Sequence, residues 1–174
     1  AILVDFKRAF DKVPFKSMLA AVEAHGIGGH LLDWLRNWTQ GRKQRVVLNG
    51  IESSWLEVTS SVVQGSVIGP ILFIIFINHL DKYVQVAGED VHLFKYADDS
   101  KLLQTITNES DPLNLQAAIN HLLRWCNDFG MELHPDKCRV VHFGSKNPQN
   151  DYYIGQNQIE SADVVKDLGI DVNR

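Results

Sequence analysis

Two adjacent aspartates, Asp98 and Asp99, are the residues of this sequence best placed to do chemistry. They lie in "FKYADDSKLL", between two apolar runs, "VHLFKY" and "KLLQTI", that predict the strands of a hairpin. An ordinary turn is one interpretation, because an aspartate carboxylate accepts hydrogen bonds from nearby backbone N–H groups. A metal site is the other, because neighbouring carboxylates repel each other unless a cation offsets their charge. Mg²⁺ prefers such oxygen ligands.

A metal site for phosphoryl transfer needs a further carboxylate from another segment. Two ions about 3.5–4 Å apart stabilise both the attacking and the leaving oxygen, and one turn does not supply enough ligands for both. Asp5 is the best candidate, since it follows the apolar run of "AILVDF", which predicts a buried strand. The alternative for Asp5 is a strand-end acid that faces solvent. We interpret Asp11 as a helix N-cap rather than a metal ligand.

The first half of the chain predicts helices and one hairpin. Residues 14–26 begin with proline and end with glycine, which is typical of a helix, and residues 30–41 repeat the apolar helical spacing. The pair Asn49-Gly50 predicts a hairpin between "RKQRVVLNG" and "SSWLEVTS". A glycine and a proline precede "ILFIIFINHL", which we expect to be a helix buried on most sides.

The second half predicts one long helix and a set of strands. Asp111 is the expected N-cap of this helix, with Pro112 at its first position. Apolar side chains then recur along one helical face as far as Phe129, and Gly130 ends the helix. "CRVVHFG", "DYYIG" and "VVKDLGIDV" predict strands. The mixed order of elements favours an α+β fold with an antiparallel sheet and helices packed on one face.

Composition sets the remaining limits. The chain has 174 residues, 45% hydrophobic and 22% charged, which suits one globular domain. Its longest apolar run, residues 71–77, is far shorter than the roughly 20 residues that span a bilayer. The net charge of −4 argues mildly against nucleic-acid binding, so such a function must be argued from a site. We expect Cys126 and Cys138 to be buried free thiols, and the four tryptophans to lie in the core.

Five motifs together resemble the palm of a reverse transcriptase. "LVDFKRAFDKV", "VVQGSVIGPILF", "YADD", "GMELHPDKCRVVHFG" and "VKDLGI" occur in that order, and the nearest match is the non-LTR (LINE-type, jockey-like) retrotransposon group. The resemblance covers essentially the whole of residues 1–174. It implies a polymerase palm with partial fingers elements and a truncated thumb. The abrupt start at "AILVDF" is also what we expect of a fragment of a longer polyprotein.

The resemblance implies an RNA-directed DNA polymerase that adds deoxynucleotides to the 3′-hydroxyl of a DNA primer on an RNA template. Asp5 and Asp98 would ligate two Mg²⁺ or Mn²⁺ ions, and Asp99 would support them. The backbone carbonyl of Phe6 would be a further ligand, since hard cations accept carbonyl oxygen. The implied partners are the template, the primer and deoxynucleoside triphosphates, with no membrane, and the implied location is the nucleus.

Further residues receive roles from the resemblance. Phe10 matches a steric gate against the ribose 2′-hydroxyl, and Gln64 and Gly65 match a nucleotide-binding turn. Tyr96 would pack beneath the primer strand, and Lys137 would protonate the departing pyrophosphate. The alternatives are a core phenylalanine for Phe10, a simple turn for the Gln-Gly pair, and a solvated surface lysine. "VKDLGI" resembles the strand that grips the primer end.

The densest basic cluster is formed by Arg42, Lys43 and Arg45. Contact with nucleic-acid phosphates would suit it, and an exposed charged hairpin edge suits it equally well. Three rival functions remain open. They are an inactive or domesticated copy that serves as a nucleic-acid-binding or structural module, a group II intron-type or telomerase-type reverse transcriptase, and a nucleotide cyclase with a palm-like fold.

Overall fold

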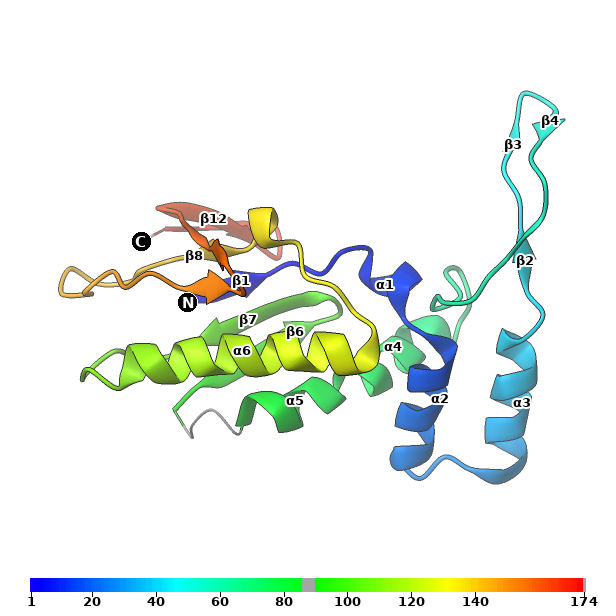
Figure 1. Cartoon of the computed structure of the whole chain (residues 1–174), viewed down its shortest axis with the longest axis horizontal. Helices are drawn as coiled ribbons and strands as arrows, with labels where there is room; N and C mark the ends of the chain where they lie inside the picture. Colours follow the sequence, from blue (N-terminus) through cyan, green and yellow to red (C-terminus); the bar gives the residue numbers. More distant parts are fainter. Residues whose placement is uncertain (86–89, 174) are drawn as a thin grey trace. The chain divides into compact units, whose positions relative to one another are not determined.

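The computed structural model describes residues 1–85 and 90–173 (Figure 1). The chain divides into two compact units. One contains Ala1–Ala9 and Ile77–Arg174, and we call it the sheet unit. The other contains Phe10–Phe76, and we call it the arm unit. Helices and strands are mixed along the chain, so the predicted α+β class is confirmed.

The sheet unit is built on a five-stranded sheet with the strand order β11-β8-β1-β7-β6. The central strand, β1 (Ile2–Val4), is antiparallel to both β7 (Asp99–Leu103) and β8 (Arg139–Val140). β6 (His92–Tyr96) pairs antiparallel with β7, so the predicted hairpin around the two aspartates is confirmed. β11 (Glu160–Ser161) pairs parallel with β8. The sheet is therefore mixed, and the prediction of an antiparallel sheet is wrong at this edge.

The parallel pairing at the edge follows from the connection between β8 and β11. The chain leaves β8 and forms a separate antiparallel ribbon of β9 (Tyr153–Ile154) and β10 (Asn157–Gln158) before β11. This detour brings the chain back in the direction of β8, as a connection between parallel strands must. The apolar pattern of the sequence does not indicate that the chain comes back to pair parallel with β8.

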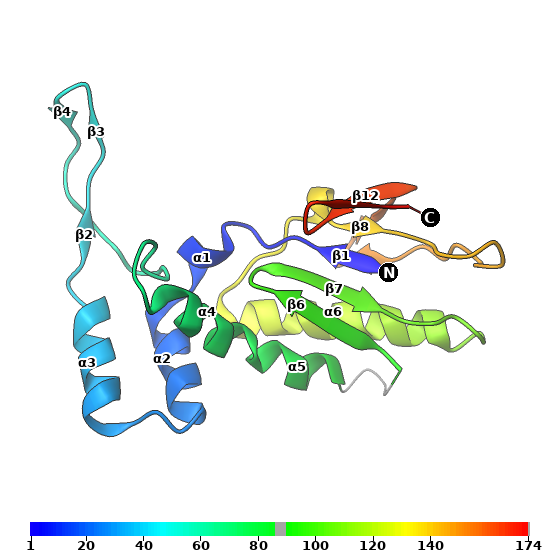
Figure 2. The same ribbon diagram turned by 180° about the vertical axis from the view of Figure 1, so that it is seen from behind.

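The two faces of the sheet have different surroundings. Ile2 and Leu102, paired in register, are fully buried, and α5 (His79–Val84) and α6 (Asp111–Phe129) lie on one side of the sheet (Figures 1 and 2). Leu3 and its partner Lys101 point to the other side, because side chains alternate along a strand. Helices on one face were predicted, and this arrangement agrees with that prediction.

The long helix α6 agrees closely with the sequence pattern. Leu115, Ile119, Leu122 and Cys126 are all buried along one face, and Gly130 ends the helix with a left-handed φ of 73°. Both cysteines of the chain are free and buried, as predicted, and burial raises the pKa of the Cys126 thiol to about 12.

The predicted N-cap of α6 is wrong by one residue. Asp111 is the first helical residue, and its carboxylate accepts hydrogen bonds from the backbone N–H groups of Thr107 at 2.6 Å and Asn108 at 3.0 Å. These bonds lower the pKa of Asp111. The side chain therefore satisfies the loop that precedes the helix rather than the first turn of the helix itself.

The arm unit combines helices with a β-ribbon. The Asn49-Gly50 hairpin is confirmed, and both residues have the positive φ values, 50° and 79°, that the turn requires. Lys43 pairs with Glu57 farther along the same ribbon, which we call the arm. The elements of the unit are α1 (Ala9–Lys12, continuing from the sheet unit), α2 (Phe15–Ala24), α3 (Gly29–Thr39), β2 (Lys43–Gln44), β3 (Val47–Leu48), β4 (Ile51–Glu52), β5 (Leu56–Glu57) and most of α4 (Gly69–Ile77).

Two predictions of burial in the arm unit are wrong. The helix α4 buries Phe73 and Phe76, but Ile71 and Ile74 are 55% and 51% exposed. The helix is therefore buried on one side only, although nearly all its residues are apolar. Trp34 and Trp55 are also 51% and 57% exposed rather than in the core. Apolar composition alone does not say how many sides of an element are covered.

Trp125 of α6, in contrast, is fully buried as predicted. None of the helices within the described ranges is long and apolar enough to cross a membrane.

Substituting Leu122 by alanine is expected to lower the free energy of unfolding by about 2–5 kcal/mol, because its side chain is buried between α6 and the sheet. Leu113 of the same helix is 70% exposed, so Leu113→Ala is the matched control and should change the free energy of unfolding by less than about 0.5 kcal/mol. Chemical denaturation measures both. Equal effects of the two substitutions would contradict the assigned face of α6.

Candidate active site

The pairing of β1 with β7 brings the predicted acidic residues together. The last pair in register is Val4 with Ser100. Asp5 follows Val4, and Asp99 precedes Ser100. Because the strands are antiparallel, both aspartates lie at the same end of this pair of strands. Asp98 precedes Asp99 in the turn. Asp5 and Asp99 are 94 residues apart in the sequence, and the antiparallel register of the central strands brings them together.

The hairpin turn that carries the acids is tight. Tyr96 pairs with Asp99, so the connection consists of Ala97 and Asp98 alone. Ala97 adopts a left-handed φ of 52°, which is uncommon for a residue with a side chain. Two-residue hairpin connections need such angles to match the twist of their strands. The geometry of the turn thus fixes the backbone of Asp98 directly beside the end of β7.

The electrostatics of the cluster are unfavourable without a cation. The pKa of Asp99 is raised, first because burial disfavours its charged form and then because the carboxylates of Asp98, Asp167 and Asp5 repel it. Lys101 acts in the opposite direction and lowers this pKa. Two of the repelling groups are the predicted partners, and the turn is therefore part of a wider acidic site.

A second segment, residues 132–138, fixes the backbone around Asp5. The N–H of His134 donates to the Asp5 carbonyl at 2.9 Å, and the N–H of Lys7 donates to the Glu132 carbonyl at 2.8 Å. Phe6 lies between these bonds, in an antiparallel bridge with Leu133. In such a bridge the peptide groups of the middle residue point away from the partner. The Phe6 carbonyl therefore points toward the β7 side of the strand.

The side chain of Phe6 has a different role from its carbonyl. It is buried and packs edge-on against Trp125, with 6.0 Å between ring centroids. On the other side of this backbone, the Asp5 N–H lies 3.4 Å from the sulfur of Cys138. Lys137 is exposed and adjoins this cysteine at the end of a 3₁₀ turn, Pro135–Lys137. The predicted lysine is thus anchored through its neighbour to the backbone of Asp5.

A pocket of about 290 Å³ opens on the face of the sheet away from the helices. Tyr96 and Asp99 line it from the β6–β7 hairpin, and Asp167 and Leu168 line it from a second hairpin, formed by β12 (Val164–Asp167) and β13 (Ile170–Asn173). "VKDLGI" is therefore the turn region of a hairpin and not a single strand. The pocket therefore lies between this hairpin and Asp99, and neither Asp5 nor Asp98 lines it.

An ion pair that sequence reasoning missed holds the two hairpins together. Lys101 of β7 pairs with Asp167 of β12, and their side chains are only 33% and 23% exposed. Asp167 lies inside a quoted motif, but nothing in its immediate sequence indicates Lys101 as the partner. The pair places a cation beside the acidic cluster and neutralises the carboxylate that comes from β12.

The residues predicted to contact the nucleotide gather in the arm unit. The ring of Phe10 stacks on Phe73 with centroids 4.3 Å apart, and the Gln64 amide donates to the Asp11 carboxylate at 2.7 Å. Asp11 lies inside α1 and receives this bond, so its interpretation as an N-cap is wrong. Gly65 has a φ of 80° and open space around its Cα, so its conformation alone favours glycine.

The basic cluster lies at the base of the arm. The guanidinium of Arg45 lies 4.5 Å from the Trp55 ring centroid and also forms an ion pair with Glu52. Arg42 lies over the Trp38 ring at 5.7 Å. Two of the three predicted cations therefore sit on tryptophan rings, a feature that the sequence did not indicate. Phosphate binding by the cluster stays a prediction.

The acidic cluster offers oxygen ligands of the kind that Mg²⁺ and Mn²⁺ accept, from the carboxylates and from the Phe6 carbonyl. Within residues 1–85 and 90–173, no group of three or more histidine, cysteine, aspartate or glutamate side chains is arranged to hold a metal ion. Metal binding by Asp5, Asp98 and Asp99 therefore stays a prediction.

Comparison with known proteins gives a consistent family match. Residues 1–172 match the family described as reverse transcriptase (RNA-dependent DNA polymerase). The chain is 25% identical to the RNA-directed DNA polymerase from mobile element jockey of Drosophila melanogaster, over 82% of this chain and 16% of that protein. It is 28% identical to the jockey protein of Drosophila funebris, over 80% and 16%.

A third relative comes from another element. The polyprotein of the type-2 retrotransposable element R2DM of Drosophila melanogaster is 24% identical over 96% of this chain and 17% of its own length. The chain thus spans about a sixth of the length of these curated relatives.

Asp99→Asn is expected to raise the free energy of unfolding at neutral pH in buffer without divalent cations. A raised folded-state pKa means that the charged form of Asp99 destabilises the fold. This destabilisation is present above the folded pKa and fades as pH falls toward the ordinary value of 3.8, so the gain from asparagine should fade as well. Asp136→Asn, at an exposed site outside the cluster, is the control. A loss of stability in Asp99→Asn at pH 7 would contradict the electrostatic description.

Lys101 and Asp167 are expected to couple by about 1 kcal/mol in a double-mutant cycle of Lys101→Met and Asp167→Asn, measured by denaturation. The exposed pair Arg36–Asp33 is the reference, with an expected coupling of about 0.3–0.5 kcal/mol. The more exposed reference pair should lose its coupling sooner as salt is added. A coupling of Lys101 with Asp167 no larger than the reference would mean that the ion pair does not hold the hairpins together.

Proposed function

Because this chain belongs to the reverse transcriptase (RNA-dependent DNA polymerase) family, we propose that it is the palm, with partial fingers elements, of the RNA-directed DNA polymerase of a non-LTR retrotransposon. The observation that carries the proposal is the acidic cluster at the ends of β1 and β7, built by the strand register from Asp5, Asp98 and Asp99. The palm acts within a longer polyprotein, and copying takes place in the nucleus.

The reaction is transfer of a nucleotide to a DNA primer on an RNA template. The primer 3′-hydroxyl attacks the α-phosphorus of a deoxynucleoside triphosphate, the bond from that phosphorus to the bridging oxygen breaks, and pyrophosphate leaves. Asp5 and Asp98 would hold two Mg²⁺ ions, and the Phe6 carbonyl would be a further protein ligand. When bound, the ions supply the positive charge that offsets the developing negative charge of the transition state. Burial and the neighbouring carboxylates raise the pKa of Asp99, and a bound cation would offset the repulsion from those carboxylates.

Two residues of the arm unit select and hold the nucleotide. The ring of Phe10, held by its stacking on Phe73, blocks a ribose 2′-hydroxyl and so favours deoxynucleotides. Gln64 presents its amide to the nucleotide and the template, and its bond to Asp11 orients that amide. Gly65 supplies the left-handed backbone that forms the turn.

The remaining roles belong to the pocket and its surroundings. Tyr96 lies beneath the primer strand, and the β12–β13 hairpin holds the primer end above the acidic cluster. Lys137 donates a proton to the leaving pyrophosphate, a contribution of typically 10²–10⁴-fold for a positioned acid. Arg42, Lys43 and Arg45 contact phosphates of the template, without reading its sequence.

Asp98→Asn in the full-length protein is expected to lower the rate of primer extension on an RNA template by about 10³-fold, because one ligand of the catalytic ions loses its charge. The rate of primer extension is measured from the incorporation of labelled deoxynucleotide, with and without Mg²⁺. Asp136→Asn is the matched control and should extend primers at the wild-type rate.

If the full-length protein is well folded but shows no Mg²⁺-dependent primer extension, the proposed polymerase activity is excluded. That result would favour a binding or structural module. Wild-type extension by Asp98→Asn would remove this residue from the site.

A further inference from the structure

Three side chains of the arm unit form a stacked column that the core does not require. The ring centroids of Trp34 and Trp38 are 5.9 Å apart, and the two rings are only 9° from parallel. The guanidinium of Arg42 lies over the Trp38 ring. Trp34 and Trp38 lie four residues apart on one side of α3, and Arg42 follows the end of this helix at Thr39. Leu32 and Leu35, on other positions of the helix, are the buried ones. Trp34 is 51% exposed, whereas Trp38 and Arg42 are half-buried, so the column meets solvent mainly through Trp34.

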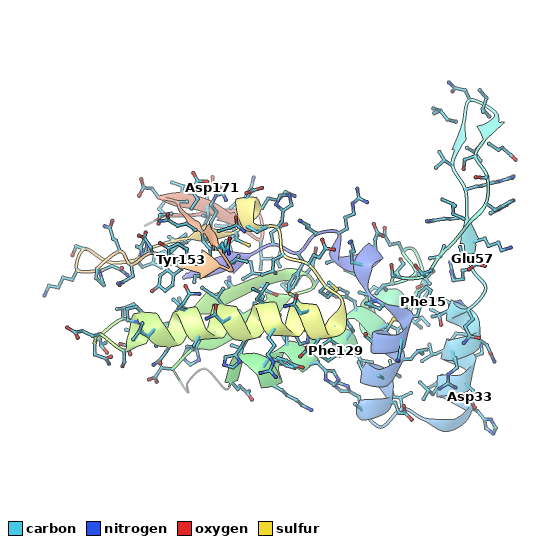
Figure 3. The ribbon with its side chains drawn as sticks, viewed as in Figure 1. Phe15, Asp33, Glu57, Phe129, Tyr153 and Asp171 are labelled. Atoms are coloured by element: carbon cyan, nitrogen blue, oxygen red, sulfur yellow. The ribbon has the colours of Figure 1, made fainter. Side chains whose placement is uncertain are left out.

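A second cation–aromatic pair lies on the arm itself. Arg45 covers one face of Trp55, and that tryptophan is still 57% exposed. Lys43, two residues before Arg45, is exposed and begins β2 (Lys43–Gln44). Lys43 pairs in register with Glu57, labelled in Figure 3. A flat apolar ring and a neighbouring cation thus occur together twice in the same unit.

The local charge of this region differs from that of the whole chain. The chain has a net charge of −4, whereas residues 34–51 contain four cations and no acidic residue. Arg36 and Arg45 are paired with Asp33 and Glu52. Within the part of the chain that the structure describes, neither Arg42 nor Lys43 forms an ion pair. Arg42, which lies over the half-buried Trp38, and the exposed Lys43 are therefore available to an anionic partner.

We infer that the surface formed by the column and the Arg45–Trp55 pair binds single-stranded nucleic acid, here the unpaired part of the template RNA. Bases stack on the exposed faces of Trp34 and Trp55, and phosphates contact Arg42 and Lys43. Every base has a flat face that stacks on an aromatic ring, and only an unpaired strand exposes these faces fully. The choice of template RNA rests on the proposed function, but binding does not require catalysis.

The tip of the arm is a different kind of surface. Val47, Leu48 and Ile51 are 57%, 69% and 78% exposed and carry neither rings nor charges. Such a patch suits a protein partner rather than a nucleic acid. The tip therefore serves as an internal reference, because a general attraction of RNA to exposed apolar groups would involve it as strongly as the tryptophans.

The test is binding of a fluorescein-labelled 12-nucleotide oligouridylate to the 174-residue chain, followed by anisotropy without Mg²⁺ or nucleotides. Trp34→Leu and Trp55→Leu remove the rings but keep an apolar side chain, and each is expected to weaken binding by about 10-fold. Trp34→Phe should recover most of the affinity. Leu48→Ala is the matched control at the tip and should bind as wild type. Thermal unfolding checks that each variant is folded.

Salt dependence separates the phosphate contacts from the stacking. Arg42→Gln and Lys43→Gln are each expected to reduce the slope of log K against log salt concentration by about 1, whereas the tryptophan variants should leave it unchanged. A blunt-ended RNA duplex of the same length should bind more weakly than the oligouridylate, because its bases are not exposed.

Several results would overturn the inference. They are no binding of oligouridylate by the wild type, wild-type affinity in both tryptophan-to-leucine variants, equal affinity for the duplex, or an equal loss in Leu48→Ala. The proposed polymerase activity is judged separately, because these titrations contain neither metal ions nor nucleotides. A protein that extends primers but binds oligouridylate independently of Trp34 and Trp55 would refute this inference alone.

Discussion

The antiparallel register of β1 against β7 is the constraint on which the site depends. It sets Asp5 beside Asp99 at one end of the sheet, where their charges repel each other and that of Asp98. A shift of the register by one residue would turn Asp5 to the other face, because side chains alternate along a strand. The burial of Ile2 and Leu102 on the helical face stabilises the register that the acids alone would oppose.

The same alternation separates stability from chemistry. The face toward α5 and α6 is apolar and closed, whereas the opposite face carries Lys101 and Asp99 and borders the pocket. The ion pair of Lys101 with Asp167 then attaches the β12–β13 hairpin to this second face. A sheet buried on one face only can thus concentrate charge on the other without disturbing its core. The fold tolerates the repulsion between the carboxylates of the acidic cluster because burial on the apolar face stabilises the sheet.

The arm unit follows another principle, in which side chains that could fill a core lie on the surface. Ile71, Trp34 and Trp55 are each more than half exposed, although their types are typical of interiors. Trp55 lies against Arg45, and Trp34 stacks on Trp38, which in turn lies against Arg42, whereas α4 shows plain apolar exposure. Exposed apolar groups of this extent are characteristic of binding surfaces. The unit therefore contributes surfaces for partners more than it contributes core.

The sequence by itself determined the α+β class, both hairpins and the face of α6, because these follow from patterns between near neighbours. The motif order also indicated Asp5, whose distance along the chain no local pattern bridges. Only the tertiary structure decided the parallel edge strand, the partner of Asp167 and the exposure of the tryptophans. Each of these depends on which distant segments meet, and that choice arises from the packing of the whole unit rather than from any short stretch.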